Sequence, residues 1–177
     1  MTRIPLIALV MTFAVCARAA PSEQERLPPD AQAGNYVGSD VMIPMRDGVK
    51  LHAEIWRPRG DTSKLPILMQ RSPYGFGLSR VKRSMDAEFK ELAQEGFIFV
   101  LEDIRGRFGS AGEFVMLRPK TTAKDGVDES TDTYDSISWL IKSLPNNNGK
   151  VGVFGVSYLG WTTAMATVGA HPALKAV

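Results

Sequence analysis

The chain has 177 residues, of which 44% are hydrophobic and 23% charged, and its formal net charge at pH 7 is +2. This composition is that of an ordinary folded protein of about one domain, and it excludes the disordered and fibrous classes. Beyond residue 19 the chain holds 19 basic and 19 acidic residues, so charge gives no reason to expect nucleic acid or an anionic membrane as a partner.

The first 19 residues have the pattern of an export signal. Arg3 gives a positive start, an apolar run covers residues 4–16, and Ala17-Arg18-Ala19 has the form of a cleavage site. A membrane anchor remains an alternative, although the run is well short of the ~20 residues that a spanning helix needs. Lipid modification of Cys16 is another, although the usual small residue is missing before it. We expect a mature protein that begins near Ala20, is secreted or periplasmic, and does not contact the membrane.

The only cysteine, Cys16, lies inside this expected signal. The mature chain would therefore have neither a disulfide nor a thiol nucleophile. Covalent chemistry in it must use oxygen or nitrogen.

The next part of the chain predicts a lead-in followed by a hairpin. Residues 20–36 contain three prolines and no apolar period, so we expect them to be exposed. Folding should begin at residue 37, with β-prone runs at 39–45 and 49–56 that are joined across Arg46-Asp47-Gly48.

From residue 66 onward, short apolar runs alternate with helical patterns. Strands are expected at 66–70, 97–101 and 151–156, and the start of another at 174–177. The expected helices are one bearing Met85, Phe89, Leu92 and Ala93 that ends at Gly96, one over 130–144 with Tyr134, Ile137, Leu140 and Ile141 facing inward, and one over 159–170. This order predicts a mostly parallel three-layer α/β sheet behind the N-terminal hairpin, with 37–177 as the N-terminal part of one domain.

One motif carries chemistry. The segment Gly155-Val156-Ser157-Tyr158-Leu159-Gly160 stands between an expected buried strand and a helix, where a nucleophile elbow would lie. A serine at such a tip can reach a carbonyl carbon while the dipole of the new helix faces the developing oxyanion.

Two other interpretations of this segment remain. Ser157 can serve as an ordinary N-cap at a strand-to-helix turn, and the spacing alone does not separate this from the elbow. A dinucleotide-binding G-x-G-x-x-G is disfavoured, because serine occupies the middle position and no acidic residue follows about 20 positions later.

Four segments in order resemble the CocE/NonD hydrolases, which include cocaine esterase, α-amino-acid ester hydrolases, glutaryl acylases and relatives of X-Pro dipeptidyl peptidase. The segments are Met45-Arg46-Asp47-Gly48-Val49-Lys50-Leu51, Arg71-Ser72-Pro73-Tyr74-Gly75, Asp103-Ile104-Arg105-Gly106-Arg107-Phe108-Gly109-Ser110-Ala111-Gly112 and residues 155–160. The stretch 128–135 together with Trp139 looks most like the α-amino-acid ester hydrolase and glutaryl acylase branch. The resemblance covers nearly all of the chain from residue 37.

The resemblance implies an α/β-hydrolase fold and a role for three residues. Ser157 would be the nucleophile, and the oxyanion donors would be the backbone N–H of Tyr158 and the hydroxyl of Tyr74. An aromatic lid packed on the core is the alternative for Tyr74. The substrate would be a small-molecule ester or amide, of α-amino-acid ester or β-lactam type by the nearest branch, with no cofactor and no metal. The resemblance leaves open whether the complete protein is a homo-oligomer.

The remaining titratable clusters favour structural roles. In this fold the acid and histidine of the triad follow the serine in that order, so His52 comes too early and His171 too soon after the elbow. Asp125, Asp128, Glu129, Asp132 and Asp135 lack the spacing of an EF-hand and instead open a helix, where they favour its N-terminus. The glycines at 106, 109 and 112 indicate a structured loop braced by Asp103 and Arg105.

The sequence therefore predicts the N-terminal part of a serine hydrolase that lacks its triad Asp and His and is inactive alone. The alternatives are a non-catalytic α/β-hydrolase-like binding domain and an inactive gene fragment. Activated serine reacts quickly with a fluorophosphonate, and this reaction separates the hydrolase from the binding domain.

Overall fold

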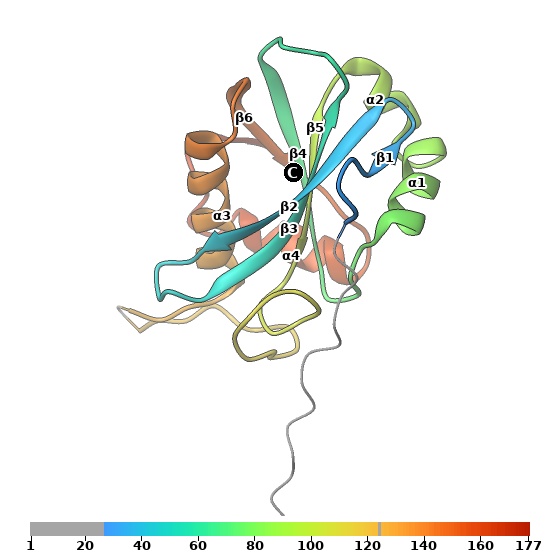
Figure 1. The fold of residues 1–177 in the computed structure, drawn as a ribbon. Coiled ribbons are helices and arrows are strands. Elements are labelled where there is room, and N and C mark those ends of the chain that lie inside the picture. The colour runs from blue at the N-terminus through green and yellow to red at the C-terminus, as the bar shows by residue number, and fades with distance from the viewer. Residues whose placement is uncertain (1–26, 124) are drawn as a thin grey trace, which may run out of the picture.

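The computed structural model describes residues 27–123 and 125–177, so the expected export signal lies outside the described residues. A seven-stranded mixed sheet crosses the molecule in the order β1-β2-β3-β5-β4-β6-β7 (Figure 1). The strands are β1 (Gln32–Ala33), β2 (Tyr36–Pro44), β3 (Lys50–Pro58), β4 (Leu65–Ser72), β5 (Ile98–Asp103), β6 (Asn147–Val153) and β7 (Leu174–Ala176). The predicted hairpin is the antiparallel pair β2–β3.

The two halves of the sheet differ in direction. The pairs from β1 to β5 are antiparallel, whereas β5, β4, β6 and β7 run parallel to one another. The carboxyl ends of the parallel strands therefore meet at one edge of the sheet, which is where open α/β folds place their ligands.

Helices cover both faces of the sheet (Figure 1). They are α1 (Leu78–Asp86), α2 (Lys90–Glu95), α3 (Glu129–Ser143) and α4 (Tyr158–Ala166). The alternation along β5 shows the division, because Val100 belongs to the core that includes Ile137 of α3, while Phe99 belongs to the core that includes Val81 of α1. The predicted three-layer α/β architecture is confirmed.

The helix expected around Met85 is broken in two. Its chain turns at Ala87 and restarts as α2 after Phe89, and it ends as predicted at Gly96, which is left-handed. The break seats Phe89 in an aromatic cluster, where its ring stacks on Phe99 with centroids 5.1 Å apart. The packing of the Phe89 ring thus stabilises a break in the helix.

Three other expectations are corrected. The segment expected to be exposed through residue 36 packs from Ala31 onward, because β1 pairs with β2 and Tyr36 is buried. Tyr134 does not face inward: it is 36% exposed, with its ring against His171. Strand β6 ends at Val153, so residues 154–157 belong to the turn. None of the helices in the described residues is long and apolar enough to cross a membrane.

Candidate active site

Ser157 lies at the tip of the connection between β6 and α4. Its backbone has φ 61° and ψ −122°, a conformation that residues with a Cβ rarely adopt. The residue is exposed, and so is its neighbour Val156. Backbone strain of this kind costs roughly 1–3 kcal/mol and clusters at functional sites.

Glycine makes this turn possible. A Cβ on Gly155 would lie 2.5 Å from the carbonyl carbon of Leu159, so no side chain fits between the end of the strand and the first turn of α4. A Cβ on Gly160 would be 3.3 Å from the carbonyl oxygen of Gly155. The two glycines therefore let α4 start directly behind the serine.

The side chain of Ser157 makes no capping hydrogen bond to α4. An ordinary N-cap serine would accept a hydrogen bond from the first turn. The first N–H groups of α4, including that of Tyr158, have no acceptor within the helix. The geometry thus differs from the N-cap alternative that the spacing left open.

Tyr74 stands at the same edge of the sheet. It follows β4, which pairs in parallel with β6, so both connections leave the sheet side by side. Its side chain is 54% exposed rather than packed as a lid, and its ring meets the ring of Tyr158 edge-on at 6.1 Å. The structure therefore brings together all three residues that the sequence nominated.

Tyr158 also links the elbow to the long connection before α3. Its hydroxyl accepts a hydrogen bond from the N–H of Leu117 at 2.9 Å. Burial raises the pKa of this hydroxyl above its ordinary value. The residues at 115–117 are exposed and apolar, so an apolar segment lies beside Tyr158.

A buried ion network under this edge was not predicted from the sequence. Arg71 at the end of β4 pairs with Glu102 of β5 at 2.6 Å and with Glu129 of α3 at 2.8 Å, and both Arg71 and Glu102 have no exposed surface. The carbonyl of Arg71 accepts a hydrogen bond from Thr162 of α4. The network thus joins four of the elements around the elbow. Its only sequence signal is the presence of charged residues inside apolar strand segments.

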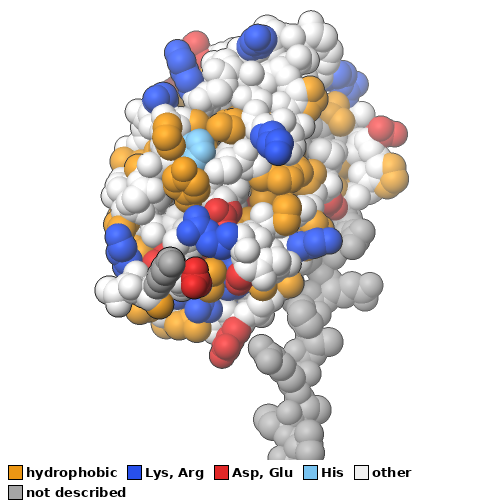
Figure 2. Space-filling view, turned by 90° about the vertical axis from the view of Figure 1, so that its left-hand side faces the viewer, with side chains coloured by type: hydrophobic (Ala, Val, Ile, Leu, Met, Phe, Trp, Pro, Cys, Tyr) orange, Lys and Arg blue, Asp and Glu red, His pale blue; other side chains and the backbone are white. Residues whose placement is uncertain are grey.

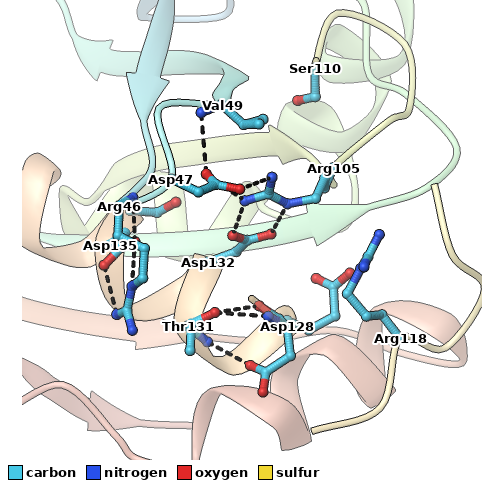
Figure 3. A network of polar contacts seen from close by, with 12 residues as sticks. Arg46, Asp47, Val49, Arg105, Ser110, Arg118, Asp128, Thr131, Asp132 and Asp135 are labelled. Atoms are coloured by element: carbon cyan, nitrogen blue, oxygen red, sulfur yellow. Dashed lines mark hydrogen bonds and ion pairs between the residues drawn. The ribbon is translucent and has the colours of Figure 1, made fainter. Parts of the chain in front are cut away.

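Of the acidic residues near residue 128, Asp128 caps the start of α3 as predicted, whereas Glu129, Asp132 and Asp135 pair with arginines of other segments. Asp128 is the N-cap and accepts a hydrogen bond from Thr131 N in a capping box (Figure 3). Asp132 accepts from Arg105, whose guanidinium also pairs with Asp47 in the hairpin turn (Figure 3). Among residues 27–123 and 125–177, no group of three or more His, Cys, Asp and Glu could hold a metal ion.

The loop that follows β5 is braced as expected. Asp103 accepts hydrogen bonds from His52 and from the N–H of Gly109. The second ring nitrogen of His52 contacts Asp40 at 3.1 Å. His171 lies just before β7, at the amino ends of the parallel strands and away from Ser157. Neither histidine is in place to serve the serine.

Charge is dispersed over the face that includes α3. Lys and Arg side chains are scattered over it, with Asp and Glu mainly in the lower half of the view and hydrophobic side chains between them (Figure 2). This view of the described residues presents no field of a single sign, in line with the neutral balance of the sequence beyond residue 19.

The sheet order, the helices on both faces and the sharp turn at Ser157 are those of the α/β-hydrolase fold. Comparison with known proteins identifies the family: the chain belongs to the X-Pro dipeptidyl-peptidase (S15 family), whose model matches residues 47–177. The resemblance to the CocE/NonD hydrolases is thereby confirmed.

Individual relatives are enzymes that act on esters or peptides. Cocaine esterase of Rhodococcus sp. (strain MB1 Bresler) is 39% identical over 145 residues, which cover 81% of this chain and 23% of the esterase. An aminopeptidase from a marine sediment archaeon (Thaumarchaeota archaeon) superposes with a TM-score of 0.74 at 40% identity, over 90% of this chain and 27% of its own. An α-amino acid ester hydrolase gives 0.72 at 37%, over 96% and 28%. The chain thus spans about a quarter of the length of these relatives.

Proposed function

We propose that this chain supplies the nucleophile and the oxyanion donors of a serine hydrolase that cleaves or transfers the acyl group of an ester or amide. The observation that carries the proposal is the strained, exposed backbone of Ser157 at the start of α4. Family membership supports hydrolysis in general, and the elbow supports a covalent acyl-enzyme in particular.

In the proposed reaction, the Oγ of Ser157 attacks the carbonyl carbon of the substrate. The oxyanion that forms is held by the backbone N–H of Tyr158 and the hydroxyl of Tyr74, with the positive end of α4 behind them. A general base takes the serine proton and returns it to the leaving group, and water then releases the acyl group.

The base and its acidic partner are proposed to come from the part of the family's proteins that this chain does not span. His52 cannot act without leaving its two aspartate partners, and His171 stands at the opposite end of the parallel strands. The chain alone is accordingly expected to be inactive, and both labelling and turnover are therefore measured on the protein expressed from its complete gene.

The substrate proposed is a small ester or amide of the α-amino-acid ester or β-lactam type. It is supported by the 37% identity to an α-amino acid ester hydrolase over 96% of the chain. A non-catalytic binding domain built on the same fold is the rival, and it would leave Ser157 unreactive.

The proposed function is tested by reaction with a fluorophosphonate probe. The wild-type protein should be labelled at Ser157 within minutes, and Ser157→Ala should lose the label completely. The control Ser79→Ala replaces an exposed serine of α1 and should label like the wild type. A folded wild type that stays unlabelled would favour the binding domain, and a label that survives in Ser157→Ala would place the nucleophile elsewhere.

We also propose that the protein is exported, on the basis of the pattern in residues 1–19. Sequencing the N-terminus of the protein recovered from the periplasm or the medium should give Ala20 as its first residue. Recovery of an intact Met1 from the cytoplasm would contradict this.

A further inference from the structure

The loop that presents Tyr74 is held by two arginines from different elements. Arg107, in the connection after β5, donates from Nε to the carbonyl oxygen of Pro73 at 2.8 Å. Arg80, in α1, donates from Nη1 to the carbonyl oxygen of Gly75 at 2.9 Å. These two carbonyls flank Tyr74 on either side. The backbone of Tyr74 is thus fixed at the residue before it and at the residue after it.

Both guanidinium groups are themselves held against aromatic rings. Arg107 lies over Phe108 and Phe114, with its Cζ 5.2 Å and 5.0 Å from their centroids. Arg80 lies over Phe76 at 5.5 Å. Such cation–π contacts orient a planar guanidinium and leave its edge free to donate. The two donors are therefore directional, unlike a mobile surface arginine.

Phe108 adds a steric support beneath the same loop. It is one of the few residues other than glycine with a positive φ, at 44°, which is an unfavourable conformation for an aromatic residue. Its ring packs so closely on Gly75 that a Cβ there would come within 2.8 Å of it. The strained backbone turns the ring toward the loop, and only glycine leaves room for it.

Tyr74 needs such support because its side chain is 54% exposed. The backbone must set the direction of the hydroxyl, apart from the edge contact with Tyr158. A donor to an oxyanion has to lie within a narrow range of distances, about 2.7–3.1 Å. Small displacements of the loop would therefore weaken it.

We propose that Arg107 and Arg80 are positioning residues that clamp residues 73–75 and so aim the Tyr74 hydroxyl at the oxyanion. The clamp rests on the proposed function, because it acts through Tyr74 and has no role without that hydroxyl. The sequence predicted a braced loop at Asp103 and Arg105 but gave no reason to connect Arg107 with Tyr74, which lies 33 positions earlier.

The test measures turnover of an activated ester, p-nitrophenyl acetate, by the protein from its complete gene. Arg107→Ala and Arg80→Ala should each lower kcat about 10- to 100-fold while KM changes less than about twofold, because misplacement of a reacting geometry by ~1 Å has effects of this size. Arg118→Ala is the matched control for Arg107, since Arg118 also donates to a backbone carbonyl, that of Glu113. Arg83→Ala, in α1, is the control for Arg80. Both controls should keep the wild-type kcat.

The decisive readout is the double variant with Tyr74→Phe. Once the hydroxyl is gone, Arg107→Ala should lower kcat by less than about twofold further. If the two losses multiply, or if Arg107→Ala alone leaves kcat unchanged, the clamp is overturned. If instead Ser157→Ala keeps its turnover, the proposed function itself has failed.

The variant Arg107→Lys is included in case Arg107→Ala does not fold. Lysine keeps the positive charge but lacks the planar group that lies between the two rings, so we expect a folded protein with a kcat between those of the wild type and Arg107→Ala. If Arg107→Ala does not fold, the same double variant with Arg107→Lys decides the question. Full recovery by lysine would show that charge alone matters, which overturns the geometric clamp.

Discussion

Helices α3 and α4 begin in opposite ways, although each starts at a polar residue that follows a connection from the sheet. Asp128 has an extended backbone, is 1% exposed, and accepts hydrogen bonds from Thr131 N and Ser130 Oγ. Ser157 has a positive φ of 61°, is exposed, and makes no capping hydrogen bond. The N-terminus of α3 is capped by the side chain of Asp128, whereas no side chain caps the N-terminus of α4.

This difference separates a structural helix start from a candidate binding one. At α3 the orphan N–H groups and the positive end of the helix are neutralised by Asp128. At α4 the first N–H groups remain available to an anion. The serine beside them is exposed by a strained backbone. The buried pair Arg71–Glu102 is linked to α4 behind the strained turn, because the carbonyl of Arg71 accepts a hydrogen bond from Thr162.

Gly155→Ala should give the largest effect on the comparison. The added Cβ would lie 2.5 Å from the carbonyl carbon of Leu159, so α4 must move away from the sheet and carry Ser157 out of position. We expect the rate of fluorophosphonate labelling to fall by at least about 100-fold. Gly149→Ala is the control for the steric contact: a Cβ there meets nothing within 4 Å, and although the φ of 73° strains an alanine and lowers stability, labelling of the folded protein should not change. Unchanged labelling of Gly155→Ala would mean that the close approach does not shape the elbow.

Asp128→Ala, at the start of α3, should lower the stability of the protein and leave the labelling of Ser157 unchanged. Removing the cap leaves Thr131 N and Thr121 N without their acceptor, so the free energy of unfolding should fall by about 1–2 kcal/mol. Labelling of Ser157 should stay within about twofold of the wild type. Asp86→Ala, at the exposed end of α1, is the control for loss of a carboxylate. A matching loss of labelling would mean that the two helix starts are not independent.

The effect of Asp128 should depend on pH. Burial opposes ionisation, but hydrogen bonds from Ser130 and Thr131 outweigh it and hold the pKa of Asp128 below its ordinary value of 3.8. The stabilisation is therefore present above that value and is lost as pH falls through the lower pKa of the folded state. Melting temperatures of the wild type and Asp128→Ala should differ at pH 5–7, and the gap should narrow as the pH falls below about 4. A constant gap would contradict the assignment.

The order of elements could be predicted from the sequence because it depends on local periodicity. The strands β5 and β6 are apolar runs, and the cap at Asp128 and the left-handed Gly96 follow from local rules. The break at Ala87 could not be predicted, because its cause is the stacking of Phe89 on Phe99, a contact with a strand not yet formed in the pattern. The outward position of Tyr134 likewise depends on His171, from the far end of the chain.

The candidate site could also be predicted from the sequence only in part. Ser157, Tyr158 and Tyr74 were nominated from motifs and family resemblance, and their meeting at one edge follows from parallel pairing of β4 with β6. The supports of that edge were missed. Arg71, Arg80 and Arg107 act through backbone carbonyls and buried carboxylates from other segments, and no spacing in the sequence encodes such contacts.

Ser157→Gly should give the smallest and most specific effect. Glycine adopts the backbone of residue 157 without the penalty of a Cβ, whereas Ser157→Ala keeps the strain. We expect the glycine variant to be more stable to urea than the alanine variant by about 1 kcal/mol, after allowance for its more flexible unfolded chain. Both variants should lose the fluorophosphonate label.

At Ser138 the difference in stability between the glycine and alanine variants should have the opposite sign. Ser138 lies inside α3 with its hydroxyl on the carbonyl of Tyr134, where glycine should be less stable than alanine by about 1 kcal/mol. Opposite signs at the two positions would show that the backbone of residue 157, unlike that of residue 138, is held in a conformation that is unfavourable for a residue with a Cβ. If glycine is the weaker variant at both, Ser157 is an ordinary start of a helix, and the observation on which the proposed nucleophile rests is lost.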